Sequence, residues 1–124
     1  MQKQHSGFTL IELLIVFAII GILTVVIMPN LIQARSRAHD SATQSYVHQV
    51  VTGIESSRNT ITQNLPPVGP ECWEFVGTSG NPTYIKRCKY EPDLATDTYK
   101  VTAESVSGNV FQFDGSSIVI AASY

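Results

Sequence analysis

An apolar run from Phe8 to Met28 constrains this chain more than any other feature. Its 21 residues include one ionisable side chain, that of Glu12. As a helix the run would be about 32 Å long, close to the roughly 30 Å hydrocarbon core of a bilayer. Because a helix satisfies its own backbone hydrogen bonds where water is absent, the run predicts a membrane-spanning helix. A carboxyl group inside such a helix is costly, so Glu12 is a candidate functional residue.

A secretory signal peptide is the alternative interpretation of this run. Signal peptides contain about 7–15 apolar residues, followed by a cleavage site of small residues. The run here is longer and ends at Met28-Pro29-Asn30, without that pattern. A small residue, Gly7, instead precedes the run. Cleavage at that point would fall on the cytoplasmic side and leave the apolar helix on the mature protein.

A specific set of residues opens the run: a polar leader with a lysine, then a glycine, an aromatic residue and a glutamate at fixed offsets. These residues are Lys3, Gly7, Phe8, Thr9, Leu10, Ile11, Glu12, Leu13 and Leu14, with Pro29 as a further feature. The pattern resembles the type IV pilins and the related type II secretion pseudopilins. The resemblance covers roughly the first 60 residues, and the remainder is similar to the family only in general plan.

The resemblance implies that a prepilin peptidase cleaves between Gly7 and Phe8 and methylates the new amine of Phe8. A residue without a side chain suits a protease that must approach the backbone closely. The resemblance also makes Glu12 the assembly residue. In a filament of staggered helices, the amine of an incoming subunit would meet Glu12 of a neighbour, and both poorly solvated charges would gain from pairing. The alternatives are that Glu12 extends to the lipid head groups or is protonated.

Gly21 and Pro29 interrupt the helical pattern. Proline removes a backbone donor and clashes with the preceding turn, which is tolerated in lipid where neighbours satisfy the backbone. We expect a continuous helix with a bend near Pro29 in the isolated subunit. In a packed filament we expect flexibility and local unwinding between Gly21 and Pro29. A plain kink that aids packing is the alternative.

After Asn30 the helical pattern becomes amphipathic and continues to about Arg58. Its apolar residues recur every three or four positions: Leu31, Ala34, Ala38, Ala42, Val47, Val50, Val51 and Ile54. We therefore expect one helix of about 50 residues. Its second half would form the spine of a small domain, and its length fits a subunit that packs beside copies of itself.

The only two cysteines, Cys72 and Cys88, lie 16 positions apart in the polar part of the chain. A pair in a small domain that looks exported predicts a disulfide, and disulfides persist in oxidising compartments. This places the C-terminal part outside the cytoplasm. A zinc site is the alternative, but two cysteines without close histidines are a poor ligand set.

Four segments alternate or are rich in β-branched and aromatic residues: 83–90, 98–104, 109–113 and 117–121. Asp114-Gly115 predicts a tight hairpin turn, and the residues from Glu71 to Glu74 suggest a short strand or turn. We therefore expect an α+β fold class with a long N-terminal helix packed on a three- to four-stranded antiparallel meander, and the resemblance implies that this is a pilin fold.

With 124 residues and a formal net charge of −2, the chain has room for one small domain and lacks the strong positive charge of a nucleic-acid coat protein. We expect a leader at residues 1–7 and a transmembrane or filament-core helix at 8–29. The amphipathic half of the helix would span 30–60, and the connector loop and sheet 61–124.

Three groups of residues are candidate sites, but ordinary surface or packing roles explain each of them better. The first group contains two possible catalytic fragments, which are His39-Asp40 with Ser36 and His48 with Ser45. The second is Glu91, Asp93 and Asp97 as a calcium site. The third is Lys86, Arg87 and Lys89 with Tyr84 and Tyr90 as a DNA contact. We expect no catalytic residue, metal or cofactor, and DNA remains a weakly supported partner.

The sequence thus favours a structural, non-enzymatic subunit of a type IV pilus. The resemblance implies roles in twitching motility, adhesion and DNA uptake. The expected partners are copies of itself, other pilins, a prepilin peptidase, inner-membrane assembly machinery and, before assembly, membrane lipid. The subunit would cross the inner membrane once, with its N-terminus cytoplasmic and its head periplasmic, and become extracellular on assembly. The alternatives are a type II secretion pseudopilin and a membrane-anchored periplasmic enzyme or binding module.

Overall fold

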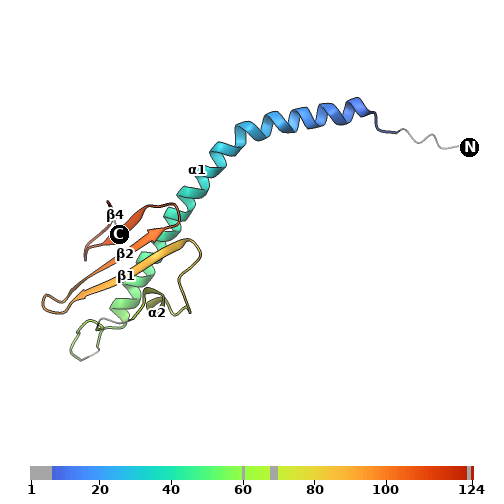
Figure 1. Cartoon of the computed structure of the whole chain (residues 1–124). Helices are drawn as coiled ribbons and strands as arrows, with labels where there is room; N and C mark the ends of the chain where they lie inside the picture. The colour runs from blue at the N-terminus through green and yellow to red at the C-terminus, as the bar shows by residue number, and fades with distance from the viewer. Residues whose placement is uncertain (1–6, 60, 68–69, 123) are drawn as a thin grey trace, which may run out of the picture. The chain divides into compact units, whose positions relative to one another are not determined.

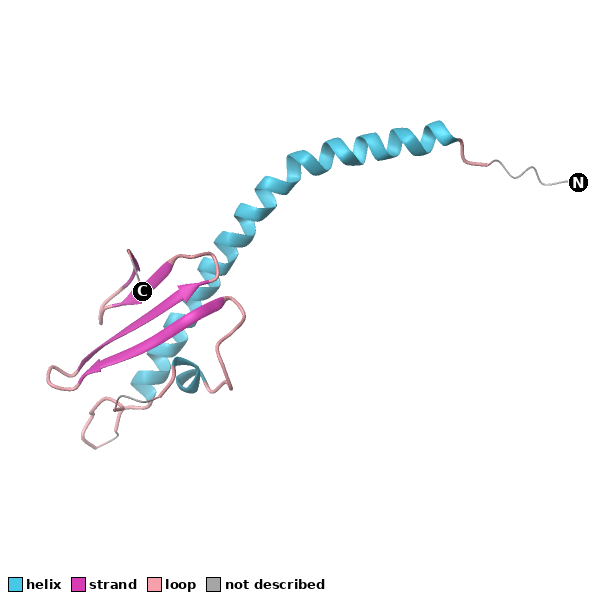
Figure 2. Ribbon diagram, viewed as in Figure 1, coloured by secondary structure: helices cyan, strands magenta, loops and turns pink. Residues whose placement is uncertain are grey.

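The computed structural model describes residues 7–59, 61–67, 70–122 and 124. The expected leader, with Lys3, lies outside these residues except for Gly7. The elements are α1 (Leu10–Ser56), α2 (Cys72–Val76), β1 (Ile85–Asp93), β2 (Thr98–Ser105), β3 (Val110–Phe113) and β4 (Ile118–Ala121), as Figures 1 and 2 show. The chain divides into two units, Met1–Arg35 and Ser36–Tyr124, and the second is called the head below.

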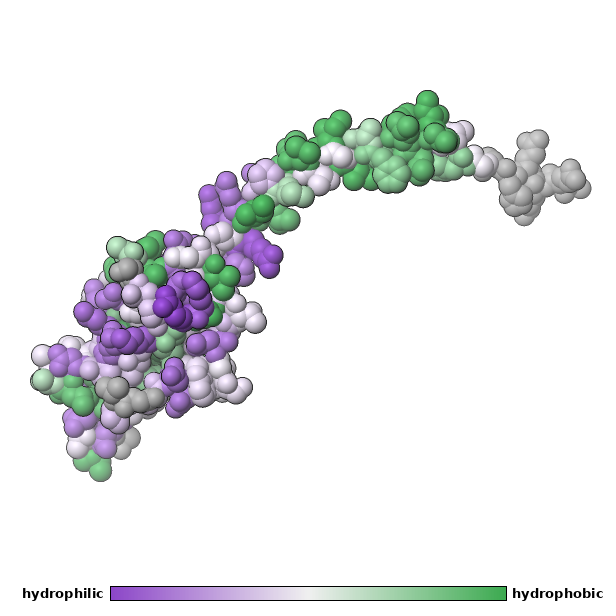
Figure 3. Space-filling model, viewed as in Figure 1, coloured by the Kyte–Doolittle hydropathy of each residue, from purple (hydrophilic) through white to green (hydrophobic). Residues whose placement is uncertain are grey.

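The large apolar side chains of α1 from Leu10 to Ile32 are exposed, and Figure 3 shows one face of this apolar surface. Among the described residues, α1 is the one helix long and apolar enough to cross a membrane. It is continuous through Pro29, as expected. The side-chain amide of Asn30 donates to the carbonyl of Val26 at 3.4 Å, which adds a donor in the turn that proline interrupts. The bend near Pro29 stays a prediction.

The head contains one antiparallel sheet in the order β1-β2-β3-β4, which confirms the meander. The predicted hairpin turn lies between β3 and β4. There Asp114 Oδ1 accepts hydrogen bonds from the backbone N–H groups of Ser116 at 3.0 Å and Ser117 at 3.1 Å. Gly115 has a φ of 101°, a conformation that favours glycine.

The core of the head lies between one face of the sheet and the second half of α1. The buried side chains from the helix are Tyr46, Val47, Val50 and Ile54, and those from the strands include Ile85, Tyr90, Tyr99, Val101, Ala103 and Phe111. The alternation predicted for β2 is therefore confirmed. Burial of each large apolar side chain contributes about 1.5–3 kcal/mol, so this interface holds helix and sheet together.

The segment expected to be a strand or turn is instead the helix α2, so that interpretation was wrong. Glu74 Oε1 accepts a hydrogen bond from the N–H of Glu71 at 3.3 Å, and Gly77 ends the helix with a φ of 75°. The predicted disulfide is present: Cys72 at the start of α2 is bonded to Cys88 on β1, with 6.0 Å between their Cα atoms. It fixes α2 beside the first strand.

Candidate assembly site

The first turn of α1 is closed by reciprocal hydrogen bonds between Thr9 and Glu12. Glu12 Oε2 accepts from the backbone N–H of Thr9 at 2.8 Å and from its hydroxyl at 2.7 Å. The N–H of Glu12 donates back to Thr9 Oγ1 at 3.3 Å. This is a capping box, which satisfies backbone donors that a helix start leaves open. Sequence reasoning missed this role of Thr9, although the Thr-x-x-Glu spacing is its signal.

The residues on either side of the expected cleavage point are freely accessible in the structure. Phe8 is 78% exposed. A Cβ added at Gly7 would have no atom within 4 Å, and the same holds at Gly21. Packing against the described residues therefore does not require glycine at either position.

Large apolar side chains dominate the surface of the remaining helical part of the first unit. All its residues from Gly7 to Arg35 are exposed, and a shallow apolar hollow of about 260 Å³ runs along one side of the helix. Its lining residues are Ile20, Leu23, Thr24, Ile27, Met28 and Leu31. Thr24 satisfies its hydroxyl internally by donating to the carbonyl of Ile20 at 2.7 Å, as polar side chains in lipid must. The surface suits lipid chains or other apolar helices.

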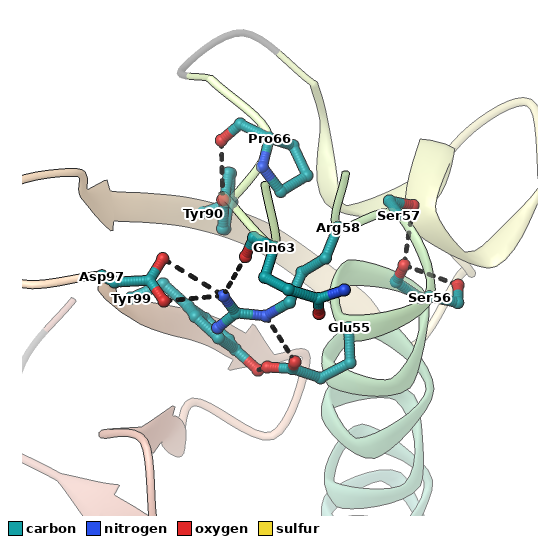
Figure 4. Close-up of polar contacts among 10 residues, drawn as sticks. Glu55, Ser56, Ser57, Arg58, Gln63, Pro66, Tyr90, Asp97 and Tyr99 are labelled. Carbon is teal, nitrogen blue, oxygen red and sulfur yellow. Dashed lines mark hydrogen bonds and ion pairs between the residues drawn. The ribbon is translucent and has the colours of Figure 1, made fainter. Parts of the chain in front are cut away.

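In the head, Arg58 connects the end of α1 to the turn between β1 and β2 (Figure 4). Its Nε donates to Glu55 Oε2 at 2.6 Å, and its Nη1 donates to Asp97 Oδ2 at 2.9 Å and to the carbonyl of Gln63 at 2.9 Å. Tyr99 donates to the other oxygen of Glu55 at 2.7 Å. The hydrogen bond from Arg58, with that from Tyr99, holds the pKa of Glu55 below its ordinary value.

The acidic residues considered for calcium are not brought together. Asp97 binds Arg58, Asp93 accepts from the N–H of Ala95 at 3.0 Å, and Glu91 pairs with Lys89 at 2.6 Å. Each carboxylate therefore serves a different local contact. No group of three or more metal-ligating side chains occurs within the described part of the chain.

The basic residues considered for DNA are mostly paired with carboxylates. Glu104 accepts from Lys86 Nζ at 2.7 Å and from Arg87 Nε at 2.8 Å, which lowers the pKa of Glu104. The guanidinium of Arg87 also lies 4.3 Å from the ring centre of Tyr124. Tyr90 is buried and donates to the carbonyl of Pro66 at 2.9 Å, so it is not available to stack on a base.

The histidine fragments do not form a catalytic arrangement either. Asp40, next to His39, accepts from the hydroxyl of Ser107 and, at 2.8 Å, from the side-chain amide of Asn109. These contacts fasten the β2–β3 turn to α1. Ser45 donates to the carbonyl of Ser41 at 3.1 Å, not to His48.

Comparisons with known proteins identify relatives that have the same fold and the same N-terminal motif. A family model described as Pilin A4 matches residues 39–121, and one described as the prokaryotic N-terminal methylation motif matches residues 2–28. The solved structure of a type IV pilin protein from Thermus thermophilus superimposes with a TM-score of 0.58 at 26% identity. It covers 66% of this chain and 97% of that one, and it confirms the predicted fold class.

Two curated relatives are named as major components of type IV pili. The type IV wide pilus major component PilA4 of Thermus thermophilus is 58% identical over 66 residues, which is 51% of this chain and 50% of that protein. The type IV major pilin protein PilE1 of Neisseria gonorrhoeae is 31% identical over 112 residues, which is 89% of this chain and 63% of that protein. The chain thus spans less than two thirds of each relative's length. Because the Pilin A4 model matches more than half of the chain, this protein belongs to the Pilin A4 family, among the type IV pilins.

Proposed function

We propose that this chain is a structural subunit of a type IV pilus filament and is held in a membrane before assembly. The observation that carries the proposal is the exposed apolar helix. From Leu10 to Ile32 its large apolar side chains are exposed, and the described residues of the chain provide no cover for them. Apolar surface of this extent is stable in lipid or against other apolar surface. A bilayer and then a bundle of sister helices supply these two environments in turn.

Processing at Gly7 prepares the subunit for assembly. A prepilin peptidase would remove residues 1–7 and methylate the new amine of Phe8. The open space that the described residues leave around Gly7 supports a role for this glycine in protease access. The mature chain would then begin with a positive amine one helical turn before Glu12.

Glu12 would set the register between subunits. Thr9 holds Glu12 Oε2 at the start of the helix through two hydrogen bonds, so the position of the carboxylate is defined before assembly. The amine of an incoming Phe8 and the Glu12 carboxylate of a neighbour each lack good solvation among apolar helices. Their pairing would favour one axial stagger over others.

The division of the chain follows from this function. Residues 1–7 form the leader, and 8–29 form the helix that crosses the inner membrane and later lies in the filament core, with Gly21 and Pro29 as its flexible points. Residues 30–60 form the amphipathic half of the helix, and 61–124 form the connector loop and sheet. Together they would be periplasmic first and extracellular after assembly. Copies of this chain, other pilins and inner-membrane assembly machinery are the partners.

A pilus is preferred over a type II secretion pseudopilus because the curated relatives are named as major pilins. The assembled filament would serve twitching motility, adhesion or DNA uptake. A non-enzymatic role is proposed because the family consists of structural subunits.

The proposal is tested by expressing variants in the native host, measuring the mass of the mature subunit and imaging surface filaments. We expect the wild-type chain to begin at a methylated Phe8. Gly7→Val should keep its leader and stay in the membrane. Glu12→Gln should be processed normally and give no filaments, whereas Glu91→Gln, the same change on the head, should assemble. A mature wild-type protein that keeps its first seven residues, or normal filaments from Glu12→Gln, would contradict the proposal.

A further inference from the structure

Two arginines follow the apolar part of α1, and the fold of the single subunit uses neither. Arg35 and Arg37 are both exposed. Neither forms an ion pair with another described residue. The ion pairs within the described part of the chain involve other cations, which are Arg58, Lys86, Arg87 and Lys89.

The carboxylates of α1 do not neutralise these two charges. The sequence contains no aspartate or glutamate between Glu12 and Asp40. Asp40 follows Arg37 by three positions, but it accepts hydrogen bonds from Ser107 and, at 2.8 Å, from Asn109 instead. The positive charge that follows the apolar part of α1 is therefore uncompensated among the described residues.

The two arginines lie at the depth of the lipid head groups if the apolar part of α1 lies in the hydrocarbon core. The exposed large apolar side chains of α1 end at Ile32. At the standard helical rise, Arg35 is about 4.5 Å and Arg37 about 7.5 Å farther along the helix. The head-group layer is about 5–7.5 Å thick on each side, because a bilayer of about 40–45 Å has a core of about 30 Å. For a helix close to the bilayer normal, both guanidinium groups would therefore meet this layer.

The proposed orientation gives these arginines a cost that the fold alone does not offset. They would lie on the periplasmic side, although lysine and arginine near the ends of a membrane span favour the cytoplasmic side. A guanidinium group binds a phosphate group through two parallel hydrogen bonds. The phosphate groups of the head-group layer therefore offer the compensation that the described carboxylates do not.

We infer that Arg35 and Arg37 bind the phosphate groups of anionic phospholipids in the periplasmic leaflet before the subunit assembles. The inference rests on the proposed membrane-bound state and names the class of lipid that holds the subunit there. Because each residue is turned by about 100° around a helix, the two side chains lie on nearly opposite sides of α1 and reach different lipids. Anionic lipids fit better than zwitterionic ones, since a zwitterionic head group carries a cation that competes for its phosphate.

Lipid competition, followed by native mass spectrometry of the full-length chain in detergent, tests the inference. The probes are phosphatidylglycerol and phosphatidylcholine. The wild type should prefer phosphatidylglycerol, and less so at high ionic strength, where exposed charges are screened. Arg35→Gln and Arg37→Gln should each weaken phosphatidylglycerol binding about fivefold, and the double variant about 25-fold. Glutamine forms helices about as well as arginine, so the near-ultraviolet circular dichroism of the head should not change.

Two control variants and one competitor complete the experiment. Arg35→Lys/Arg37→Lys should retain most of the affinity, because lysine also pairs with phosphate. Lys100→Gln, which removes an exposed charge from β2, should have no effect, and inorganic phosphate should not displace the lipid. Unchanged affinity in the double glutamine variant, an equal loss in either control variant, or displacement by inorganic phosphate would overturn the inference. The proposed function fails separately, if wild-type protein is unprocessed or Glu12→Gln assembles.

Discussion

The substitution Gly53→Ala tests the packing of α2 on α1 most directly. In an exposed helix this change stabilises by about 1 kcal/mol, because glycine is a poor helix former. At Gly53 the added Cβ would lie 2.1 Å from the Phe75 carbonyl oxygen and 2.7 Å from the carbonyl carbon, whereas real Cβ contacts are almost never below 3.0 Å. The backbone of α2 would have to move by at least 0.9 Å, the difference between 3.0 and 2.1 Å.

That movement is resisted from two sides. The disulfide fixes Cys72, three residues before Phe75, to β1, and the ring of Phe75 packs against Tyr90 with 5.0 Å between the ring centres. Overpacking of a close-packed site costs about 1–3 kcal/mol and occasionally more. Because the backbone must shift, we place this cost at the upper end of the range, about 3 kcal/mol. After the gain of about 1 kcal/mol in helix propensity, the expected net loss of stability is about 2 kcal/mol. For a head of this size, this loss lowers the melting temperature by about 10 °C.

The assay is thermal unfolding of the full-length chain in detergent, followed by near-ultraviolet circular dichroism of the head's aromatic residues. Gly21→Ala is the matched control, since it adds the same atom to the same helix in open space. The loss of stability caused by Gly53→Ala should be smaller in a variant that also lacks the disulfide, because α2 can then move away from α1. If Gly53→Ala is as stable as the wild type, the close approach of α2 to α1 is refuted.

Three further changes have definite expected outcomes in chemical or thermal unfolding of the head. Replacing Cys72 and Cys88 by serine should destabilise the head by about 3 kcal/mol, given a separation of 16 residues. The pKa of Glu104 lies below its ordinary value of 4.5 because two cations bind it, so its contribution is present at neutral pH and lost as pH falls below 4.5. Glu104→Gln should therefore flatten the acid side of the stability profile. Tyr46→Phe should cost about 1 kcal/mol, since the buried hydroxyl donates to Asn81 at 3.0 Å; an equal loss in an Asn81→Ala background would contradict this contact.

The parts of the fold that the sequence predicted are those with local signals. The long helix follows from a three- to four-residue apolar period, and β2 from alternation that places Tyr99, Val101 and Ala103 on the buried face. The β3–β4 turn follows from the conformational freedom of Asp114-Gly115. Each signal lies within the segment it describes, so no knowledge of distant residues was needed.

The parts that the sequence did not predict depend on distant contacts. The helix α2 has five residues, too few for a periodic pattern, and it is held by a disulfide to a residue 16 positions away. Arg58 reaches Asp97, 39 positions along the chain. The sequence alone does not say which of the chain's carboxylates Arg58 pairs with, because this depends on the strand register. The Thr9–Glu12 cap is different, because its Thr-x-x-Glu signal is local and the sequence analysis did not use it.

The two interior glycines of α1 show how far the subunit alone explains its sequence. Each disfavours the helix by about 1 kcal/mol relative to alanine. At Gly53 the cost is offset within the head, because α2 occupies the space that a side chain would fill. At Gly21 the described chain offers no such neighbour. Small residues allow helices in apolar surroundings to approach closely, so the packing partner of Gly21 is expected on another subunit, where alanine would disturb assembly and leave the stability of the head unchanged.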